Sequence, residues 1–418
     1  MFSSLKNKLY FPLASYFRFF AAIRLKRWKP RVIVVTGSNG KTTLLHLLES
    51  QLQEKARFSH HANSSYGIPF DILDLHRKTL QRSEWIRLIL RAPLQVFAKL
   101  PKESIYVVEA DTDRAGEGKF LAEFLRPEVV LWVSVGVTHA ANFNKDKTFA
   151  SVEEAIAYDF GYFLEFCSQL AVINGDLPLE LKQVGRTETK IESVTKSEDL
   201  NDYRIEERKT TFIINKEKYS FDALLPEEIF YALKMCKTTV KYLGLSFDAS
   251  FAKFEIPPGR GSIFQGIKYT TIIDSSYNAN LSSLKATLLM FDKLPSRKKW
   301  VVLGDMLELG EKEQEEHEKL AEVLNAMDLE KIILIGKRVS HFTYPKLKSK
   351  KVEKFEKQKD ALDYLEKNIV GGEAILFKGS QSLFLEGIIE KLLRDKKDVV
   401  SLPRRGEFWD MKRRGVGL

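Results

Sequence analysis

The segment from Val32 to Thr43, VIVVTGSNGKTT, constrains the fold of this chain more than any other. Its first four residues are β-branched and apolar, which predicts a buried parallel strand. A turn containing Gly37 and Gly40 follows, and leucines at helical spacing come after Thr43. A strand, a glycine turn and a helix in this order present backbone N–H groups and a positive dipole end to an anion. The segment therefore predicts a phosphate-binding loop.

The side chains of this loop suit a nucleotide with its magnesium ion. Lys41 is placed to reach the terminal phosphates, and Thr42 to hold Mg²⁺. The spacing differs from the common G-x-x-x-x-G-K-[ST] pattern, because Val35 stands five residues before Gly40. We expect ATP and Mg²⁺ as cofactors. The residues expected to bind the nucleotide here are Gly37, Ser38, Asn39, Gly40, Lys41, Thr42 and Thr43.

The charge of the chain is concentrated at its two ends. The 418 residues carry a net charge of +10. Residues 1–31 contain eight lysines and arginines and no acidic residue, and residues 401–418 carry +3, so the body between them has a charge of −1. A near-neutral body with basic ends does not resemble a nucleic-acid groove, so we expect no specific nucleic-acid partner.

The N-terminal segment, 1–30, interleaves aromatic residues with these bases. Its longest uncharged run, 9–17, is short and contains Pro12, which argues against a signal peptide or a membrane span. Two interpretations stay open: peripheral contact with an anionic membrane, or a helix packed on the body with its basic side in water. Cys167 and Cys236 have no zinc-type spacing, which favours a reducing, cytoplasmic compartment.

Strands alternate with helices along the body, which predicts an α/β fold. Buried strands are expected at 105–108, 129–133 and 170–173, a strand and loop over 58–75, and an antiparallel appendix over 186–221. After Pro257-Pro258-Gly259, a second unit has strands near 270–273, 300–303, 332–335 and 374–377. The Lys-rich stretch 337–360 reads as a solvated face. The expected architecture is a central parallel-sheet ATPase domain with a P-loop, followed by a smaller Rossmann-like C-terminal domain.

Several short strings, taken in order, resemble the Mur ligase family, the ATP-dependent amide-forming enzymes of peptidoglycan synthesis. The resemblance covers roughly residues 30–395 and is greatest to the branch that adds D-alanyl-D-alanine. It implies a segment at 1–30, a central domain at 31–257, a C-terminal domain at 258–398 and a basic tail at 399–418. The strings are TGSNGKTT at 36–43, GIP at 67–69, VEA at 108–110, GVTH at 136–139, INGD at 173–176, GRG at 259–261, DSSYNAN at 274–280, GDMLELG at 304–310 and KGS at 378–380.

The resemblance also implies roles for residues outside the loop. Glu109 would join Thr42 as a ligand of Mg²⁺, and His139 would hold a second Mg²⁺ near the substrate carboxylate. Arg260 would bring a second positive charge to the β- and γ-phosphates bound by Lys41. The expected catalytic residues are Lys41, His139 and Arg260; the expected metal ligands are Thr42, Glu109 and His139; the expected adenosine contacts are Asp274 and Asn278. His60 and His61 fit no motif.

The chain departs from the family pattern in three ways. Phe160 stands where these ligases carry a lysine that is carbamylated to bind the second Mg²⁺, and Asp159 is one candidate substitute. Residues 1–30 are not expected to form the family's N-terminal domain, which binds the UDP end of the substrate. Ser134, Ser275 and Gln381 replace Asn, Asp and Arg.

Three functions follow from these observations. The first is an ATP-dependent ligase that joins an amino acid or dipeptide to a cell-wall precursor carboxylate through an acyl phosphate. The second is a nucleotide-binding partner subunit without ligase activity, which Phe160 favours. The third is a ligase of the same fold that acts on a lipid-linked or polyamino-acid substrate. A monomer is expected in each case.

Overall fold

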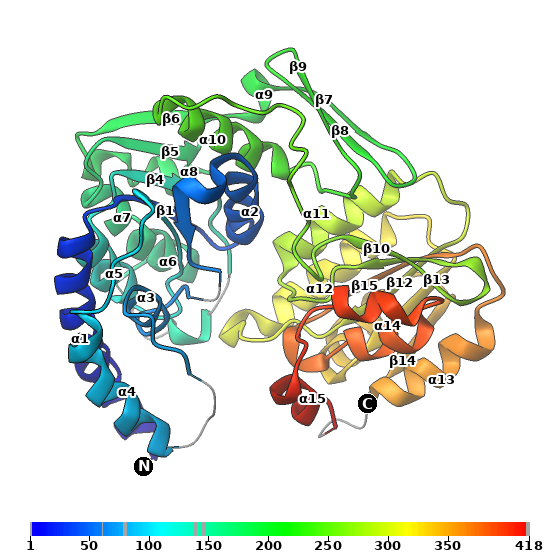
Figure 1. Ribbon diagram of the computed structural model, residues 1–418. Helices are drawn as coiled ribbons and strands as arrows, with labels where there is room; N and C mark the ends of the chain where they lie inside the picture. Colours follow the sequence, from blue (N-terminus) through cyan, green and yellow to red (C-terminus); the bar gives the residue numbers. More distant parts are fainter. Residues whose placement is uncertain (1, 61, 78–81, 138–139, 144–147, 415–418) are drawn as a thin grey trace. The chain divides into compact units, whose positions relative to one another are not determined.

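The computed structural model describes all residues except 1, 61, 78–81, 138–139, 144–147 and 415–418 (Figure 1). The chain divides into two compact units. The first comprises residues 1–136, 145–196 and 231–254, and the second comprises 137–144, 197–230 and 255–418. The α/β architecture expected from the sequence is confirmed, with a parallel sheet in the first unit and a mixed sheet in the second.

The first unit is built on a parallel sheet with strand order β2-β3-β1-β4-β5-β6. Every residue of β3, β4 and β5 is buried, as continuous apolar runs require when both faces of a sheet are covered. Parallel pairing aligns Val35 with Glu109 and Thr36 with Trp132, so the C-terminal ends of β1, β3 and β4 lie together at one edge of the sheet. The strands are β1 (Arg31–Thr36), β2 (Ala56–Phe58), β3 (Ile105–Ala110), β4 (Val129–Trp132), β5 (Leu170–Asn174) and β6 (Lys190–Val194).

Helices surround this sheet, and α1 packs along α3 and α4. Ala14, Phe17, Ala21 and Leu25 form the buried stripe of α1. Helix α1 is therefore part of the first unit rather than a detached arm. The helices up to β7 are α1 (Phe2–Trp28), α2 (Lys41–Leu52), α3 (Gly67–Ile72), α4 (Arg82–Gln95), α5 (Glu117–Leu125), α6 (Val152–Phe160), α7 (Tyr162–Glu165), α8 (Pro178–Leu181) and α9 (Lys196–Asp199); α10 (Ile229–Tyr242) follows β9.

The second unit contains a sheet with strand order β10-β11-β15-β12-β13-β14, in which only the β10–β11 pair is antiparallel. The antiparallel sheet β7-β8-β9 belongs to the same unit. The strands are β7 (Leu200–Ile205), β8 (Thr210–Ile214), β9 (Glu217–Phe221), β10 (Ser262–Gln265), β11 (Thr271–Asp274), β12 (Lys299–Gly304), β13 (Lys331–Ile335), β14 (Val352–Phe355) and β15 (Ala374–Lys378).

Helices cover both faces of the larger sheet. Val301 of β12 points into a core with Leu288 and Leu320, and the next residue, Val302, points into a core with Leu365. Side chains alternate across a strand, so each face receives its own apolar layer. The helices are α11 (Leu281–Asp292), α12 (Glu313–Asn325), α13 (Gln358–Asn368), α14 (Glu386–Leu392) and α15 (Glu407–Arg414).

Two local expectations were wrong. The stretch 58–75 contains helix α3, and the strand before it ends at Phe58. Residues 190–194 form β6 in the parallel sheet rather than part of the appendix. The Lys-rich stretch 337–360 is largely exposed, as expected, and it also contains β14, an edge strand that pairs with β13. Among the described residues, the helices include none with the length and apolar character needed to cross a membrane.

Candidate active site

The loop between β1 and α2 turns at two glycines with positive φ. Gly37 has a φ of +124° and Gly40 a φ of +83°. A Cβ added at Gly37 would lie 2.6 Å from the carbonyl oxygen of Ser134, and one at Gly40 would lie 2.9 Å from the side chain of Val133. Both the backbone conformation and the close neighbour therefore require glycine at these positions.

The end of β4 holds the loop in place. The N–H of Ser38 donates to the Ser134 carbonyl (2.9 Å), and the N–H of Asn39 donates to the Ser134 hydroxyl oxygen (2.7 Å). That hydroxyl in turn donates to the Asn39 carbonyl (2.9 Å). The hydroxyl of the serine that replaces the family's asparagine thus makes two of the three hydrogen bonds between Ser134 and the loop.

Helix α2 begins directly after this turn. Its first intrahelical bond runs from the N–H of Leu44 to the carbonyl of Gly40 (3.0 Å). The N–H groups of Lys41, Thr42 and Thr43 are accordingly donors of the first turn, which point out of the helix end. The structure thus has the strand, glycine turn and helix that the sequence predicted, and such a helix start is suited to an anion.

The ammonium of Lys41 is buried between the loop and the end of β3. It donates to the Gly37 carbonyl and forms an ion pair with Asp111 (2.8 Å). Lys41 and Asp111 are 5% and 8% exposed. The loop thus holds a positive charge at the place where the phosphates of a nucleotide would lie.

Thr42 and Glu109 lie side by side at the carboxyl edge of the sheet. The Thr42 hydroxyl donates to the Glu109 carboxylate (2.8 Å), and the Glu109 N–H donates to the Ser59 hydroxyl (3.0 Å). A hydroxyl and a carboxylate oxygen are ligands that Mg²⁺ accepts. The donor set therefore fits the cation that the sequence predicts here.

Phe160, at the family's lysine position, and its neighbour Asp159 face the interior of the first unit. Phe160 is fully buried, and its ring lies 5.9 Å from that of Trp132. Asp159 accepts the N–H groups of Gly116 (3.0 Å) and Gly118 (2.8 Å) at the start of α5. Burial raises the pKa of Asp159 to about 7. Phe160 is therefore a core residue. His139, the expected ligand of the second metal ion, lies outside the described residues.

The second unit places Asp274 at the carboxyl end of β11. Asp274 is fully buried and accepts the N–H of Ser276 (2.9 Å). Burial raises its pKa to about 6. This carboxylate shapes the turn that carries Asn278.

Lys378, at the end of β15, supports the same turn by donating to the Asn278 carbonyl (3.0 Å). Burial, together with the nearby charge of Arg260, lowers the pKa of Lys378 to about 7. The guanidinium of Arg260 lies over the ring of Tyr277, 4.5 Å from its centroid. The structure thus groups Arg260, Asp274 and Asn278 in the second unit, and the loop residues with Glu109 in the first.

Two family models match this chain. The Mur ligase middle domain matches residues 35–243, and the Mur ligase glutamate ligase domain matches residues 259–381. The chain belongs to the Mur ligase family. All the strings that suggested this family lie within the two matches.

The curated relatives of this Mur ligase include the UDP-N-acetylmuramoyl-tripeptide–D-alanyl-D-alanine ligase of Bacillus subtilis. The two sequences are 25% identical over 376 residues, covering 87% of this chain and 76% of the relative. The Escherichia coli ligase of the same name is 24% identical over 381 residues, covering 87% and 76%. The fold is that of the MurF ligase from Thermotoga maritima in complex with ADP, with a TM-score of 0.74, 23% identity, and coverage of 93% and 84%.

Three residues of these sites were missed in the sequence. Asp111 pairs with Lys41, and its signal was its place two residues after Glu109. Arg404 donates to the carbonyls of Ser276 (2.9 Å) and Tyr277 (2.7 Å). Arg404 also pairs with Glu386, so the expected basic tail holds the turn after β11.

Proposed function

We propose that this Mur ligase is an ATP-dependent, ADP-forming enzyme that joins an amino acid or dipeptide to the peptide carboxylate of a peptidoglycan precursor. The observation that carries the proposal is the contact of Thr42 with Glu109, beside the buried ammonium of Lys41. Phosphoryl transfer depends mainly on positioning and on neutralising charge, and these residues supply both. The names of the relatives, which are tripeptide–D-alanyl-D-alanine ligases, support the substrate class.

The proposed reaction has two steps. The substrate carboxylate attacks the γ-phosphorus of ATP, ADP leaves, and an acyl phosphate forms. The amine then attacks the acyl carbon, inorganic phosphate leaves, and the nitrogen loses a proton. Mg²⁺, when bound, neutralises charge on the β- and γ-phosphates.

The roles proposed for Lys41, Thr42 and Glu109 use the contacts described above. Lys41 would exchange Asp111 and the Gly37 carbonyl for phosphate oxygens, and Thr42 and Glu109 would hold Mg²⁺. Arg260 adds positive charge for the phosphates, and His139 holds the second cation. Asn278 contacts the adenosine. Asp274, being buried, acts on the adenosine contact through the turn that it shapes.

The test measures phosphate release from ATP and Mg²⁺, with and without a muramoyl tripeptide and D-alanyl-D-alanine. Release that requires both substrates and is lost in Lys41→Ala supports the ligase. ATP binding that Lys41→Ala removes, with no turnover on any acceptor, rejects it in favour of the partner subunit. Comparing UDP-linked with lipid-linked acceptors separates the first ligase hypothesis from the third.

We also propose peripheral contact with an anionic membrane. In residues 1–30 this contact would use the exposed row of α1, because the buried stripe of that helix is covered. Helix α4 extends the same surface: Ile86, Leu90 and Leu94 recur every four residues and are 63–70% exposed, and Phe97 beyond the helix is 80% exposed.

Helices α1 and α4 are joined by hydrogen bonds from Tyr16 to the Ile89 carbonyl (2.9 Å) and from Arg24 to the side-chain oxygen of Gln95 (3.3 Å). Phe19 and Ile23 occupy the row of α1 beside these contacts. The apolar surface is therefore defined here as Phe19, Ile23, Ile86, Leu90, Leu94 and Phe97.

Basic side chains border the apolar surface. Arg87 and Arg91 of α4 and Lys26 of α1 are exposed, and the only acidic residue in 82–102, Glu84, is buried. An apolar face with flanking lysines and arginines is typical of helices that lie in a membrane interface. Charge complementarity favours anionic lipids.

Vesicle sedimentation tests this surface. We expect the chain to bind vesicles containing phosphatidylglycerol, less so at high salt. A Leu90→Glu, Leu94→Glu variant should bind at least about tenfold more weakly, since burying one leucine contributes about 1.5–3 kcal/mol. Leu181→Glu, on an exposed leucine elsewhere in the first unit, is the matched control. Absence of vesicle binding would reject the membrane contact. A dimer that the double variant dissociates would reject both the membrane contact and the expected monomer.

A further inference from the structure

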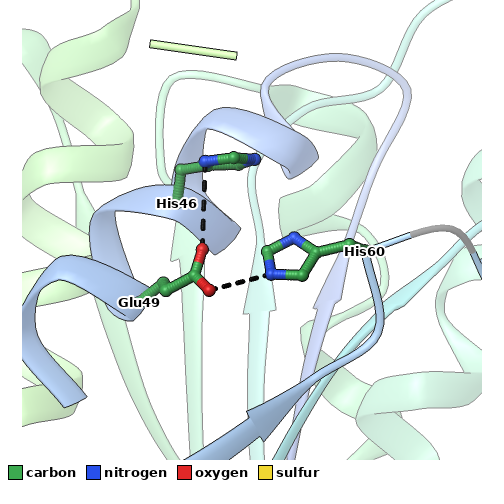
Figure 2. Close-up of side chains that lie close together, drawn as sticks. All are labelled: His46, Glu49 and His60. Carbon is green, nitrogen blue, oxygen red and sulfur yellow. Dashed lines mark hydrogen bonds and ion pairs between the residues drawn. The ribbon is translucent and has the colours of Figure 1, made fainter. Parts of the chain in front are cut away.

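Three metal-ligating side chains converge outside the site described above. His46 and Glu49 lie on α2, three residues apart, and His60 lies beyond the end of β2. Figure 2 shows the Glu49 carboxylate between the two imidazoles. The distance from His60 Nε2 to Glu49 Oε1 is 2.9 Å, and that from His46 Nδ1 to Glu49 Oε2 is 3.9 Å.

The spacing of these atoms is close to that of a metal site. One ligand atom from each of the three residues lies within 4.8 Å of the other two. Bonds of about 2.0–2.2 Å to a tetrahedral ion set neighbouring ligand atoms about 3.4 Å apart. The two measured distances lie on either side of this value, so small side-chain rotations suffice to bring all three donors to one ion.

The surroundings orient the two imidazoles. The ring of His60 stacks on Phe58 at 6.0 Å, and its centroid lies 5.2 Å from that of His46. Residues three apart share one face of a helix, so α2 presents His46 and Glu49 together. The side chains of His46, Glu49 and His60 are 24%, 41% and 31% exposed, which leaves the site open to an ion from solvent.

We propose that His46, Glu49 and His60 bind one divalent first-row transition ion, with Zn²⁺ as the representative. Two imidazole nitrogens and one carboxylate suit Zn²⁺, whereas Mg²⁺ prefers a set of oxygen ligands. The ion is separate from the Mg²⁺ expected at Thr42 and Glu109, and the site does not depend on the proposed ligase activity. Three protein ligands leave a fourth position for water.

A bound ion would join α2 to the segment after β2. His46 follows Thr42 by one helical turn, and His60 follows Ser59, which accepts the Glu109 N–H. Occupancy should therefore stabilise the part of the first unit that carries the phosphate-binding loop, because an ion that binds only the folded state raises its stability.

Equilibrium dialysis against Zn²⁺, with metal analysis of the untagged full chain, tests the proposal. We expect one Zn²⁺ per chain in the presence of excess Mg²⁺. His46→Ala and His60→Ala should each weaken binding at least about tenfold, since even residues that only orient metal ligands change affinity by about 10–100-fold. His76→Ala is the matched control, because His76 is an exposed histidine paired with one carboxylate, Asp74, at 3.3 Å.

Thermal unfolding supplies the second measurement. Zn²⁺ should raise the Tm of the wild type and of His76→Ala, with saturation at one ion, and leave the Tm of His60→Ala unchanged. Zn²⁺ binding that persists in the His46→Ala, His60→Ala double variant would place the ion elsewhere and overturn the proposal. Absence of binding to the wild type would overturn it as well.

Discussion

Arg404 and Glu386 form a bidentate ion pair from which water is almost entirely excluded. Nε of Arg404 donates to Oε1 (2.7 Å) and Nη2 to Oε2 (2.5 Å), and the side chains are 3% and 0% exposed. The same guanidinium donates to the carbonyls of Ser276 and Tyr277. The C-terminal segment therefore stabilises the turn that follows β11.

Loss of one partner of this pair should strongly destabilise the second unit. Arg404→Met leaves the buried Glu386 carboxylate with only the more distant guanidinium of Arg413, 4.0 Å away, and we expect a loss of about 3 kcal/mol of unfolding free energy. Arg405→Met, which breaks the more exposed pair with Glu390, should cost less than about 1 kcal/mol. Urea unfolding measures both. Equal losses in the two variants would contradict this expectation. The double variant Arg404→Met, Glu386→Leu should recover only part of the stability, because the hydrogen bonds from Arg404 to the carbonyls of Ser276 and Tyr277 stay lost.

Removing the hydroxyl of Thr42 should separate metal binding from folding. Thr42→Val keeps the shape of the side chain but loses the oxygen beside Glu109. We expect substrate-dependent ATP hydrolysis to fall by about 10²-fold or more, with a higher Mg²⁺ concentration for half-maximal rate. Thr42→Ser keeps the oxygen and should stay within a few-fold of wild type. Similar kinetics in the two variants would exclude Thr42 as a metal ligand.

Gly37→Ala should distort the phosphate-binding loop. A Cβ there meets the Ser134 carbonyl at 2.6 Å, and the φ of +124° is itself unfavourable for alanine. We expect a loss of about 1–3 kcal/mol in stability and weaker ATP binding, measured by denaturation and titration. Gly185→Ala is the control, because no atom lies within 4 Å of its added Cβ. An alanine at 37 that binds ATP normally would argue against a rigid loop.

The parts of the fold that the sequence predicted are those whose signals are local. β1 and β3 carry continuous apolar runs, which mark buried parallel strands whatever else surrounds them. β14 was missed because it is an edge strand: Val352 and Phe355 are only half-buried, and charged residues separate them. β10 joins the sheet by antiparallel pairing with β11, and no local sequence pattern predicts this pairing.

The candidate site likewise contains some residues that local sequence predicts and others that depend on distant partners. The loop from Gly37 to Thr43 was predictable because neighbouring residues build it. The ion pair of Lys41 with Asp111 joins residues 70 positions apart, and that separation leaves no periodic signal. His60 fitted no motif for the same reason, since its neighbours His46 and Glu49 belong to another element.

A lysine introduced at position 160 should not restore the family's carbamate. Phe160 is fully buried against Trp132, so Phe160→Lys places an ammonium in an apolar core. We expect a loss of at least about 3 kcal/mol and no gain in turnover when bicarbonate is added. Phe160→Leu should lose less than about 1.5 kcal/mol. A stable, bicarbonate-activated lysine variant would show that this position faces the site.

Asp274 should make stability depend on pH in a recognisable direction. Burial raises its pKa from 3.8 to about 6 in the folded protein. A carboxyl that binds its proton more tightly when folded favours the folded state below about pH 4, and this contribution disappears as pH rises through 6. The difference in unfolding free energy between wild type and Asp274→Asn should therefore move against the wild type by about 2 kcal/mol between pH 4 and pH 7.

Asp274→Asn is a suitable comparison because the amide oxygen can still accept the Ser276 N–H, so the turn is retained while the titration is removed. Subtracting the two pH profiles cancels the titration of every group that both proteins share. Urea unfolding at half-unit steps of pH measures the difference. A flat difference across this window would mean that Asp274 stays charged in the folded protein at pH 4. The nearby guanidinium of Arg404 would then outweigh burial, and Arg404→Met should make the difference reappear.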